Sequence, residues 1–175
     1  MCSVADDQLP SEIGEPGRAE SATQFISEFL EDLAAGAMMR EAAADPKAFL
    51  NTLRIPTDAG EYAEGLAAIL NRIPEGWGRW VRCGRGWYPL LIETDRKIAA
   101  LDPAYEVHQV KEKYGSLRSY HQLVSAGADH EAAFRIGQEA KSLSLTICEL
   151  CGAPGSVRDD GFWIWTRCDE HDPTS

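Results

Sequence analysis

Two pairs of metal-ligand residues lie near the carboxyl end of the chain. Cys148 and Cys151 form a Cys-x-x-Cys motif, Cys168 and His171 form a Cys-x-x-His motif, and residues 152–167 separate the pairs. A Cys-x-x-Cys turn directs two thiolates toward one point, and a second pair at this spacing completes the tetrahedron that Zn²⁺ prefers. Four protein ligands leave no open coordination position, so the pattern predicts a structural zinc site.

A Cys-x-x-Cys motif can also be a redox-active dithiol. A redox motif normally follows a strand and opens a helix within a βαβ unit. Here Cys151 is followed by Gly-Ala-Pro-Gly (residues 152–155), which is a turn signal. The turn favours a metal site over redox chemistry.

The composition indicates one domain with a buried core and an extra segment. The chain has 175 residues, of which 44% are hydrophobic. No run approaches the roughly 18 apolar residues of a membrane span, so no membrane association is expected. Cys2 and Cys83 lie outside the predicted metal site, and five cysteines do not make an even disulfide framework. We therefore expect a protein of the reducing cytoplasm.

The net charge of −11 is unevenly distributed. Residues 1–75 carry 14 acidic and 5 basic side chains, whereas residues 76–175 carry 14 acidic and 12 basic side chains. An acidic front section repels nucleic acid and could engage a basic partner. The simpler interpretation is a solvated surface that keeps the protein soluble.

The front section predicts a helical extension. Residues 1–20 are rich in Gly, Pro, Ser and acidic side chains and predict a disordered tail. Residues 21–75 predict an acidic helical unit, with apolar residues at helical spacing in three stretches. The second stretch begins with Asp45 as N-cap and Pro46 in the first turn, and the third runs from Ala59 to Arg72.

Aromatic and basic residues alternate with glycines from Pro74 to Tyr88. The segment contains Trp77, Arg79, Trp80, Arg82, Arg85 and Trp87. Such residues can stack on bases and hold phosphates. The alternative is a linker whose tryptophans fold onto the core and whose arginines pair with the acidic front section.

Residues 76–175 predict an α+β domain. Pro89–Leu101 and the stretch after Asp129 predict helices, and Tyr105–Val124 predicts a β-hairpin that turns at Gly115-Ser116. Pairing of Tyr114 with Leu117 would give the hairpin a packed face and a polar face. The polar face would carry Gln109, Lys111, Lys113, Arg118, Tyr120 and Gln122. Such a basic face can contact phosphates, although it is more often simply solvated.

The packed face of that hairpin would hold His108, His121 and Glu112. These side chains could be ligands or acid–base groups around a pocket, or they could be structural histidines in a partly buried setting.

Beyond the last helix, residues 157–161 predict a turn and residues 162–166 a strand that returns to Cys168. The predicted fold class is α+β: a helix and β-hairpin layer, a carboxyl-terminal zinc-ribbon-like lobe (residues 144–172) and a helical amino-terminal extension.

Four motifs occur in a fixed order along the second half of the chain. They are GWYPL (residues 86–90), QVKEKYGSLR (109–118), CELCGAPG (148–155) and WTRCDEH (165–171). Together they resemble a widespread family of small uncharacterised proteins of bacteria and their phages, over roughly residues 84–172. The resemblance implies no activity, because that family has no established function. Members of the family have a short helical front section or none.

We favour a non-enzymatic, zinc-stabilised interaction protein that binds a protein partner, in the phage–host or defence context that the resemblance suggests. No nucleophile–base pair or phosphate-binding glycine loop is evident in the sequence. One alternative is an acidic inhibitor or immunity-type protein, with a negative patch on the helices between Glu28 and Glu64. The other is a nucleic-acid-binding protein with one continuous basic surface, for which the candidate residues are Trp77, Arg79, Arg82, Arg85, Lys111, Lys113, Arg118 and Tyr120.

Overall fold

The computed structural model describes residues 35–172. The described residues combine helices with sheets, so the predicted α+β class is confirmed. The chain divides into two compact units, Met1–Ala44 and Asp45–Ser175, and residues 35–44 of the first unit are helical. The predicted tail and most of the first predicted helix lie outside the described residues. Within residues 35–172, no helix has the length and apolar character needed to cross a bilayer.

Local sequence signals explain where the first helices of the second unit begin. Helix α2 (Pro46–Asn51) starts as predicted, with the Asp45 carboxylate accepting a hydrogen bond of 2.9 Å from the backbone N–H of Ala48. A 3₁₀ turn (Gly60–Tyr62) then leads into helix α3 (Ala63–Asn71), within the stretch where the periodicity predicts a helix.

Helices α4 (Tyr88–Leu101) and α5 (His130–Ser144) also begin at local sequence signals. Helix α4 has a proline in its first turn and a preceding 3₁₀ turn (Arg85–Trp87). Helix α5 follows Asp129, whose carboxylate accepts a hydrogen bond from the N–H of Ala132. Both helices were predicted from the sequence, α5 together with its cap.

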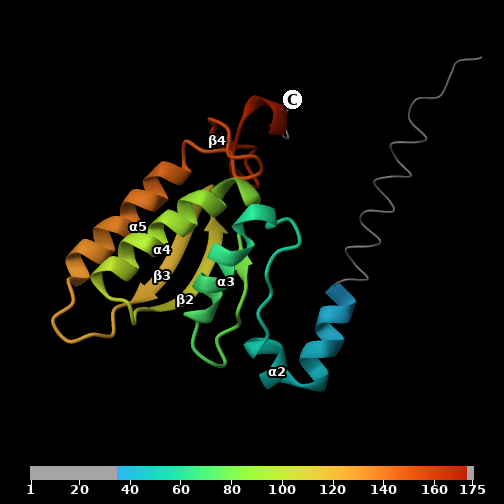
Figure 1. Ribbon diagram of the computed structural model, residues 1–175. Coiled ribbons are helices and arrows are strands. Elements are labelled where there is room, and N and C mark those ends of the chain that lie inside the picture. Colours follow the sequence, from blue (N-terminus) through green and yellow to red (C-terminus); the bar gives the residue numbers. More distant parts are fainter. Residues whose placement is uncertain (1–34, 173–175) are drawn as a thin grey trace, which may run out of the picture. The chain divides into compact units, whose positions relative to one another are not determined.

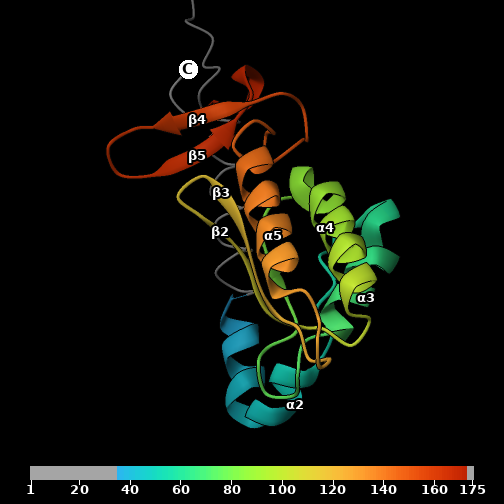
Figure 2. The ribbon, with the colours of Figure 1, turned by 90° about the vertical axis from the view of Figure 1, so that its left-hand side faces the viewer.

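A three-stranded sheet with strand order β1-β2-β3 forms the centre of the second unit. Strands β2 (Glu106–Lys113) and β3 (Ser116–Gln122) are the predicted antiparallel hairpin, and β1 (Val81–Arg82) pairs with β2 in parallel. Strand β1 was not predicted, because two residues in a segment rich in Gly, Trp and Arg show no alternation. Helices α4 and α5 cover one face of the sheet (Figure 1), and Figure 2 shows α3 on the same side.

The hairpin turn differs from the prediction. Tyr114 and Gly115 form the turn, with positive φ angles of 54° and 70°, as a type I′ turn requires. Lys113 therefore pairs with Ser116, and the predicted pairing of Tyr114 with Leu117 is wrong. The sequence favoured Gly-Ser because a tyrosine at positive φ is uncommon.

A second irregularity lies at the other end of the hairpin. The register shifts between Val107 and Gln109, so Val107 pairs with His121. Val107 is buried, and His108 is the residue without a partner at this bulge. The change at the turn shifts the pairing by two residues, so the other paired side chains stay on their predicted faces. Tyr114, which was predicted on the packed face, lies in the turn and is 66% exposed.

One hydrophobic core joins α3, α4, α5 and the sheet. Trp87 and Tyr88 are almost fully buried in it, at 0% and 2% exposure, so these two aromatic residues of the Pro74–Tyr88 segment belong to the core. Burying a side chain of this size contributes on the order of 2–3 kcal/mol. The other large and fully buried members are Leu66, Ile69, Leu70, Ile73, Leu91, Ile98, Val107, Val110 and Leu117.

A buried carboxylate ties the end of α4 to the end of the hairpin. Asp102 accepts hydrogen bonds from the backbone N–H groups of Ala104, Val124 and Ser125 and from the Ser125 hydroxyl, at 2.6–3.0 Å. Hydrogen bonds from the Ser125 backbone and hydroxyl have the largest effect on the pKa of Asp102, which falls to about 2.

Replacing this carboxylate with an amide should destabilise the fold. Asp102→Asn turns one acceptor oxygen into a donor that faces N–H groups, so we expect Tm to fall by roughly 5 °C at pH 7. Since the folded pKa of about 2 lies below the ordinary value of 3.8, the stabilisation is complete above about pH 4 and is lost as the pH falls toward 2. Thermal unfolding from pH 7 to 2 should therefore show the two Tm values converging below pH 4. A constant difference would contradict this role.

Candidate metal centre

The carboxyl-terminal lobe brings the two ligand pairs to one place. Helix α5 leads into Cys148, and a two-stranded antiparallel sheet follows, made of β4 (Ser156–Asp159) and β5 (Ile164–Arg167). Strand β5 ends beside Cys168, and a 3₁₀ turn (Asp169–His171) carries the histidine. The sequence predicted this hairpin but placed its turn too early: residues 157–159 belong to β4, and Phe162 and Trp163 belong to the turn and not to the second strand.

The four predicted ligands are close enough to bind one metal ion. The ligand atoms of Cys148, Cys151, Cys168 and His171 all lie within 4.8 Å of one another. Two distances are 3.7 Å, from Cys151 Sγ to Cys168 Sγ and from Cys148 Sγ to His171 Nδ1, and Cys168 Sγ lies 3.2 Å from the same nitrogen. Tetrahedral zinc with bonds of about 2.0–2.3 Å places its ligand atoms about 3.5–3.8 Å apart.

The chemistry of the donors agrees with this geometry. The described cysteines are free thiols, and the 3.7 Å between the Cys151 and Cys168 sulfur atoms is far longer than a disulfide bond. Three sulfurs and one imidazole nitrogen form a donor set that suits Zn²⁺. The site is therefore consistent with the predicted zinc, with all four coordination positions supplied by the chain.

The protein environment favours the thiolate form of one ligand. Burial by itself would raise the pKa of the Cys148 thiol, but backbone hydrogen bonds at Cys168, Cys151 and Leu150 lower it to about 6. Because the thiolate is the form that binds metal, Cys148 can bind at neutral pH with little cost in proton release.

Cys83 has the opposite character. Burial raises the pKa of its thiol to about 12, and the negative charges of Glu149 and Asp58 add to this effect. Cys83 does not belong to the ligand cluster found among the described residues. It is therefore a neutral thiol at physiological pH.

The loop of the first ligand pair packs directly on the backbone that precedes α4. A Cβ atom on Gly86 would lie 2.1 Å from the carbonyl oxygen of Cys148 and 2.4 Å from the backbone nitrogen of Gly152. The Gly86 N–H donates to the Glu149 carbonyl at 2.7 Å, and the Trp87 indole donates to the Ile147 carbonyl at 2.8 Å. Only glycine at position 86 allows this contact, which holds the metal-ligand loop against the core.

Two further contacts attach the lobe to the domain. The Thr166 hydroxyl is fully buried and donates to the Gly115 carbonyl at 2.5 Å, which joins β5 to the hairpin turn. The Glu149 carboxylate accepts a hydrogen bond of 2.9 Å from the Gly84 N–H and pairs with Arg167 at 3.2 Å. Burial raises the pKa of Glu149, against the effect of these two partners.

The four sequence motifs thus meet at one joint. Gly86 and Trp87 come from the first motif, Gly115 from the second, Glu149 from the third and Thr166 from the fourth. Sequence reasoning selected the ligands but missed Gly86, Glu149 and Thr166 as residues that position them. The available signal was the glycine of the first motif, since a glycine can mark a close backbone approach.

The predicted nucleic-acid contacts separate into two groups. Arg82, Lys111 and Arg118 are neighbours across the three strands, and Lys113 and Tyr120 belong to the same face by alternation. Trp77 stacks on His108 with ring centroids 4.5 Å apart, beside this face.

Two of the predicted arginines have other partners. The Arg85 guanidinium donates to the Asp58 carbonyl and lies 3.5 Å from Glu61. Arg79 donates from Nε to the Ile73 carbonyl at 3.1 Å. The negative patch expected of an inhibitor stays a prediction, because part of the range from Glu28 to Glu64 lies outside the described residues.

His108 and His121 line one cavity of about 490 Å³ beside α5, but Glu112 is not among the residues that line it. His108 stacks on Trp77, and His121 lies beside α5, where burial lowers its pKa. Glu112 accepts a hydrogen bond of 2.7 Å from the Gly115 N–H at the opposite end of the hairpin. The carboxylate therefore cannot act together with the histidines on one small substrate.

Comparison of the chain with protein-family models, with curated proteins and with solved structures found no match in any of the three. The family resemblance drawn from the motifs stays a prediction.

Removal of one ligand should remove the metal. We expect about one zinc per chain in the wild-type protein and less than about a tenth of that in Cys168→Ser, measured by plasma mass spectrometry. Chelation should lower the wild-type Tm by roughly 5 °C or more, because the short lobe depends on the metal for stability. Cys83→Ser is the matched control and should keep its zinc. A Cys168→Ser protein with full zinc content would refute the ligand assignment.

A methyl group at the joint should disturb the lobe. Gly86→Ala forces the metal-ligand loop away from the core, so we expect a loss of about 2–3 kcal/mol in the free energy of unfolding in urea. Zinc affinity, measured by competition with a chromophoric chelator, should fall about tenfold. Gly137→Ala on α5 is the control, because its Cβ would meet only the His121 side chain, at 3.2 Å. Equal behaviour of the two variants would show that the joint is not needed.

Proposed function

We propose that this protein is a non-enzymatic binding protein in which a structural Zn²⁺, bound by Cys148, Cys151, Cys168 and His171, stabilises a zinc-ribbon-like lobe that presents aromatic side chains to a protein partner. The observation that carries the proposal is the exposure of Phe162 and Trp163, at 95% and 59%, in the turn between β4 and β5. Large apolar side chains exposed together on a folded surface commonly mark an interaction site.

A cleft lies beside these aromatic residues. Its volume is about 490 Å³, and it is lined by the β2–β3 turn and by the β4–β5 turn. Tyr114, which is 66% exposed, contributes from the first turn. Aromatic side chains dominate the energetic centres of protein interfaces, and a cleft between them can accept an apolar side chain of the partner.

The turn that carries the two aromatic residues is ordered by a carboxylate. Asp160 accepts hydrogen bonds from the backbone N–H groups of Trp163 at 2.7 Å and Phe162 at 2.9 Å. These bonds lower the pKa of Asp160, the Trp163 N–H having the larger effect. A turn that is already ordered loses less conformational entropy on binding, which favours affinity.

Zinc has a clear role in such a surface. Each strand of the β4–β5 hairpin has four residues, and an isolated two-stranded hairpin is at best marginally stable in water. The metal would link the end of β5 to the loop that packs on Gly86 and so hold the aromatic turn in place. We also propose that the protein acts in the reducing cytoplasm. The resemblance suggests a phage–host or defence context for this role.

A capture experiment with matched variants tests the aromatic surface. Tagged wild-type protein, Phe162→Ser/Trp163→Ser and Phe134→Ser are used on nuclease-treated lysate of the source cells. Phe134, on α5, is 63% exposed and controls for the loss of an exposed phenylalanine elsewhere. We expect a stoichiometric protein with the wild type and the control and at least about tenfold less with the double variant, as the loss of two interface aromatics predicts.

The double variant must keep its zinc and its Tm for the comparison to count, and both side chains are exposed enough for that to be expected. Equal capture by the double variant would place the interface elsewhere. A preparation without any stoichiometric protein would contradict the proposed function.

A further inference from the structure

The face of the β1–β3 sheet that points away from α4 and α5 carries a row of three positive charges. Arg82 pairs with Lys111, and Lys111 pairs with Arg118. Neighbouring strands are about 4.8 Å apart, so the three side chains start within roughly 10 Å. Of the valines that alternate with them, Val110 is buried in the core, and Val81 is partly buried and packs against it.

The row has no negative partner within the described residues. No carboxylate in residues 35–172 forms an ion pair of 4.0 Å or less with Arg82, Lys111 or Arg118. Like charges at directly opposite positions of neighbouring strands destabilise a sheet. The Arg118 Nε is also buried and has no hydrogen-bond partner among residues 35–172, which is costly for a charged donor. An anionic ligand would relieve both costs.

Aromatic rings lie among these charges. Tyr120 is 47% exposed, and Lys111 Nζ lies 5.6 Å from its ring centroid. The Arg82 guanidinium lies 5.7 Å from the centroid of the Trp80 ring. Trp77 is 56% exposed and stacks on His108 of β2. Flat rings beside positive charges suit a ligand that has both planar groups and phosphates.

Helices α3, α4 and α5 do not cover this face. Figure 2 shows α3, α4 and α5 on the opposite side of β2 and β3. Gln109, Lys113 and Tyr120 are exposed, which agrees with a face that no other element of residues 45–172 covers fully.

We propose that this open sheet face binds single-stranded nucleic acid. Arg82, Lys111 and Arg118 contact successive backbone phosphates, and Tyr120 and Trp77 stack on unpaired bases. Stacking requires bases that are free of a double helix, and a sheet with exposed aromatics is a common platform for such strands. An acidic peptide could use the charges but not the rings. The site is separate from the turn at Phe162 and Trp163, so this inference does not rest on the proposed protein partner.

Fluorescence anisotropy of the full chain with a labelled 12-nucleotide single strand tests the proposal, once with RNA and once with DNA. Neutralising three phosphates gives a slope of roughly −2 in a plot of log affinity against log salt. The affinity should therefore fall roughly 20-fold between 50 and 200 mM salt. Lys111→Gln and Arg82→Gln should each reduce that slope by about 0.7. Tyr120→Ser should weaken binding by roughly 5- to 100-fold without changing the slope.

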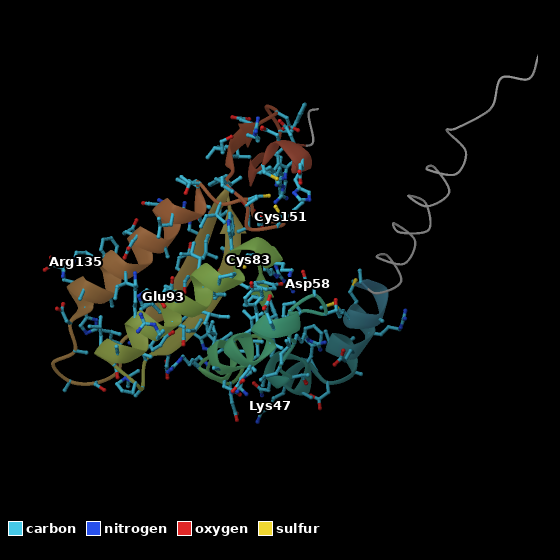
Figure 3. The ribbon with its side chains drawn as sticks, turned by 45° about the horizontal axis from the view of Figure 1, so that its top comes forward. Lys47, Asp58, Cys83, Glu93, Arg135 and Cys151 are labelled. Carbon is cyan, nitrogen blue, oxygen red and sulfur yellow. The ribbon has the colours of Figure 1, made fainter. Side chains whose placement is uncertain are left out.

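The controls remove the same charge from the helical side. Arg96→Gln on α4 and Arg135→Gln on α5 remove exposed arginines that are paired with Glu93 and Glu131, and Figure 3 shows Arg135 on α5, far from the lobe. Both variants should bind like the wild type. If the control variants weakened nucleic-acid binding as much as Lys111→Gln and Arg82→Gln, the effect would come from net charge alone, and the proposal would be overturned.

Two competitors identify the ligand class. A duplex of the same sequence and poly-glutamate should each compete at least about tenfold less well than the unlabelled single strand, because neither offers unpaired bases. Equal competition by the duplex, or by poly-glutamate, would overturn the single-strand assignment. Absence of binding at 50 mM salt would overturn the whole inference.

Discussion

The contact between the Gly86 backbone and the loop that carries Cys148 and Cys151 is the constraint on which the rest of the second unit depends. It joins two segments about 60 residues apart in the chain at backbone van der Waals distance, and a hydrogen bond on each side fixes it. Trp87, the next residue, is fully buried in the core. The position of the metal site is therefore set by the same few residues that begin α4.

This joint explains how a short lobe can present a rigid surface. The β4–β5 hairpin is attached to the core through Gly86, to the hairpin turn through Thr166, and to itself through the four potential metal ligands. Each attachment is small, but together they restrain the turn at Phe162 and Trp163 from three directions. Restraint lowers the entropy lost on binding, which is the physical link between the metal site and the proposed interaction surface.

The charge distribution gives the two sides of the sheet different properties. The helical side carries paired charges, such as Arg96 with Glu93 and Lys97 with Glu139. The open side carries a row of cations that form no such pairs with residues 35–172, although the chain as a whole has a net charge of −11. Local arrangement, and not total charge, decides what such a surface can attract, because screening limits the reach of exposed charges to about 10 Å.

The sequence by itself determined the α+β class, α2, α3, α4 and α5, the hairpin and the four clustered ligands, because these depend on local signals: caps, periodicity and a four-residue ligand spacing. Only the tertiary structure decided the rest. Strand β1 exists because β2 offers it a partner, and Tyr114 adopts a positive φ because the register requires it. Other features also depend on residues that are distant in the chain. They are the row of Arg82, Lys111 and Arg118, the contact at Gly86 and the burial of Trp87. Such contacts depend on how the elements pack, and no local pattern encodes that packing.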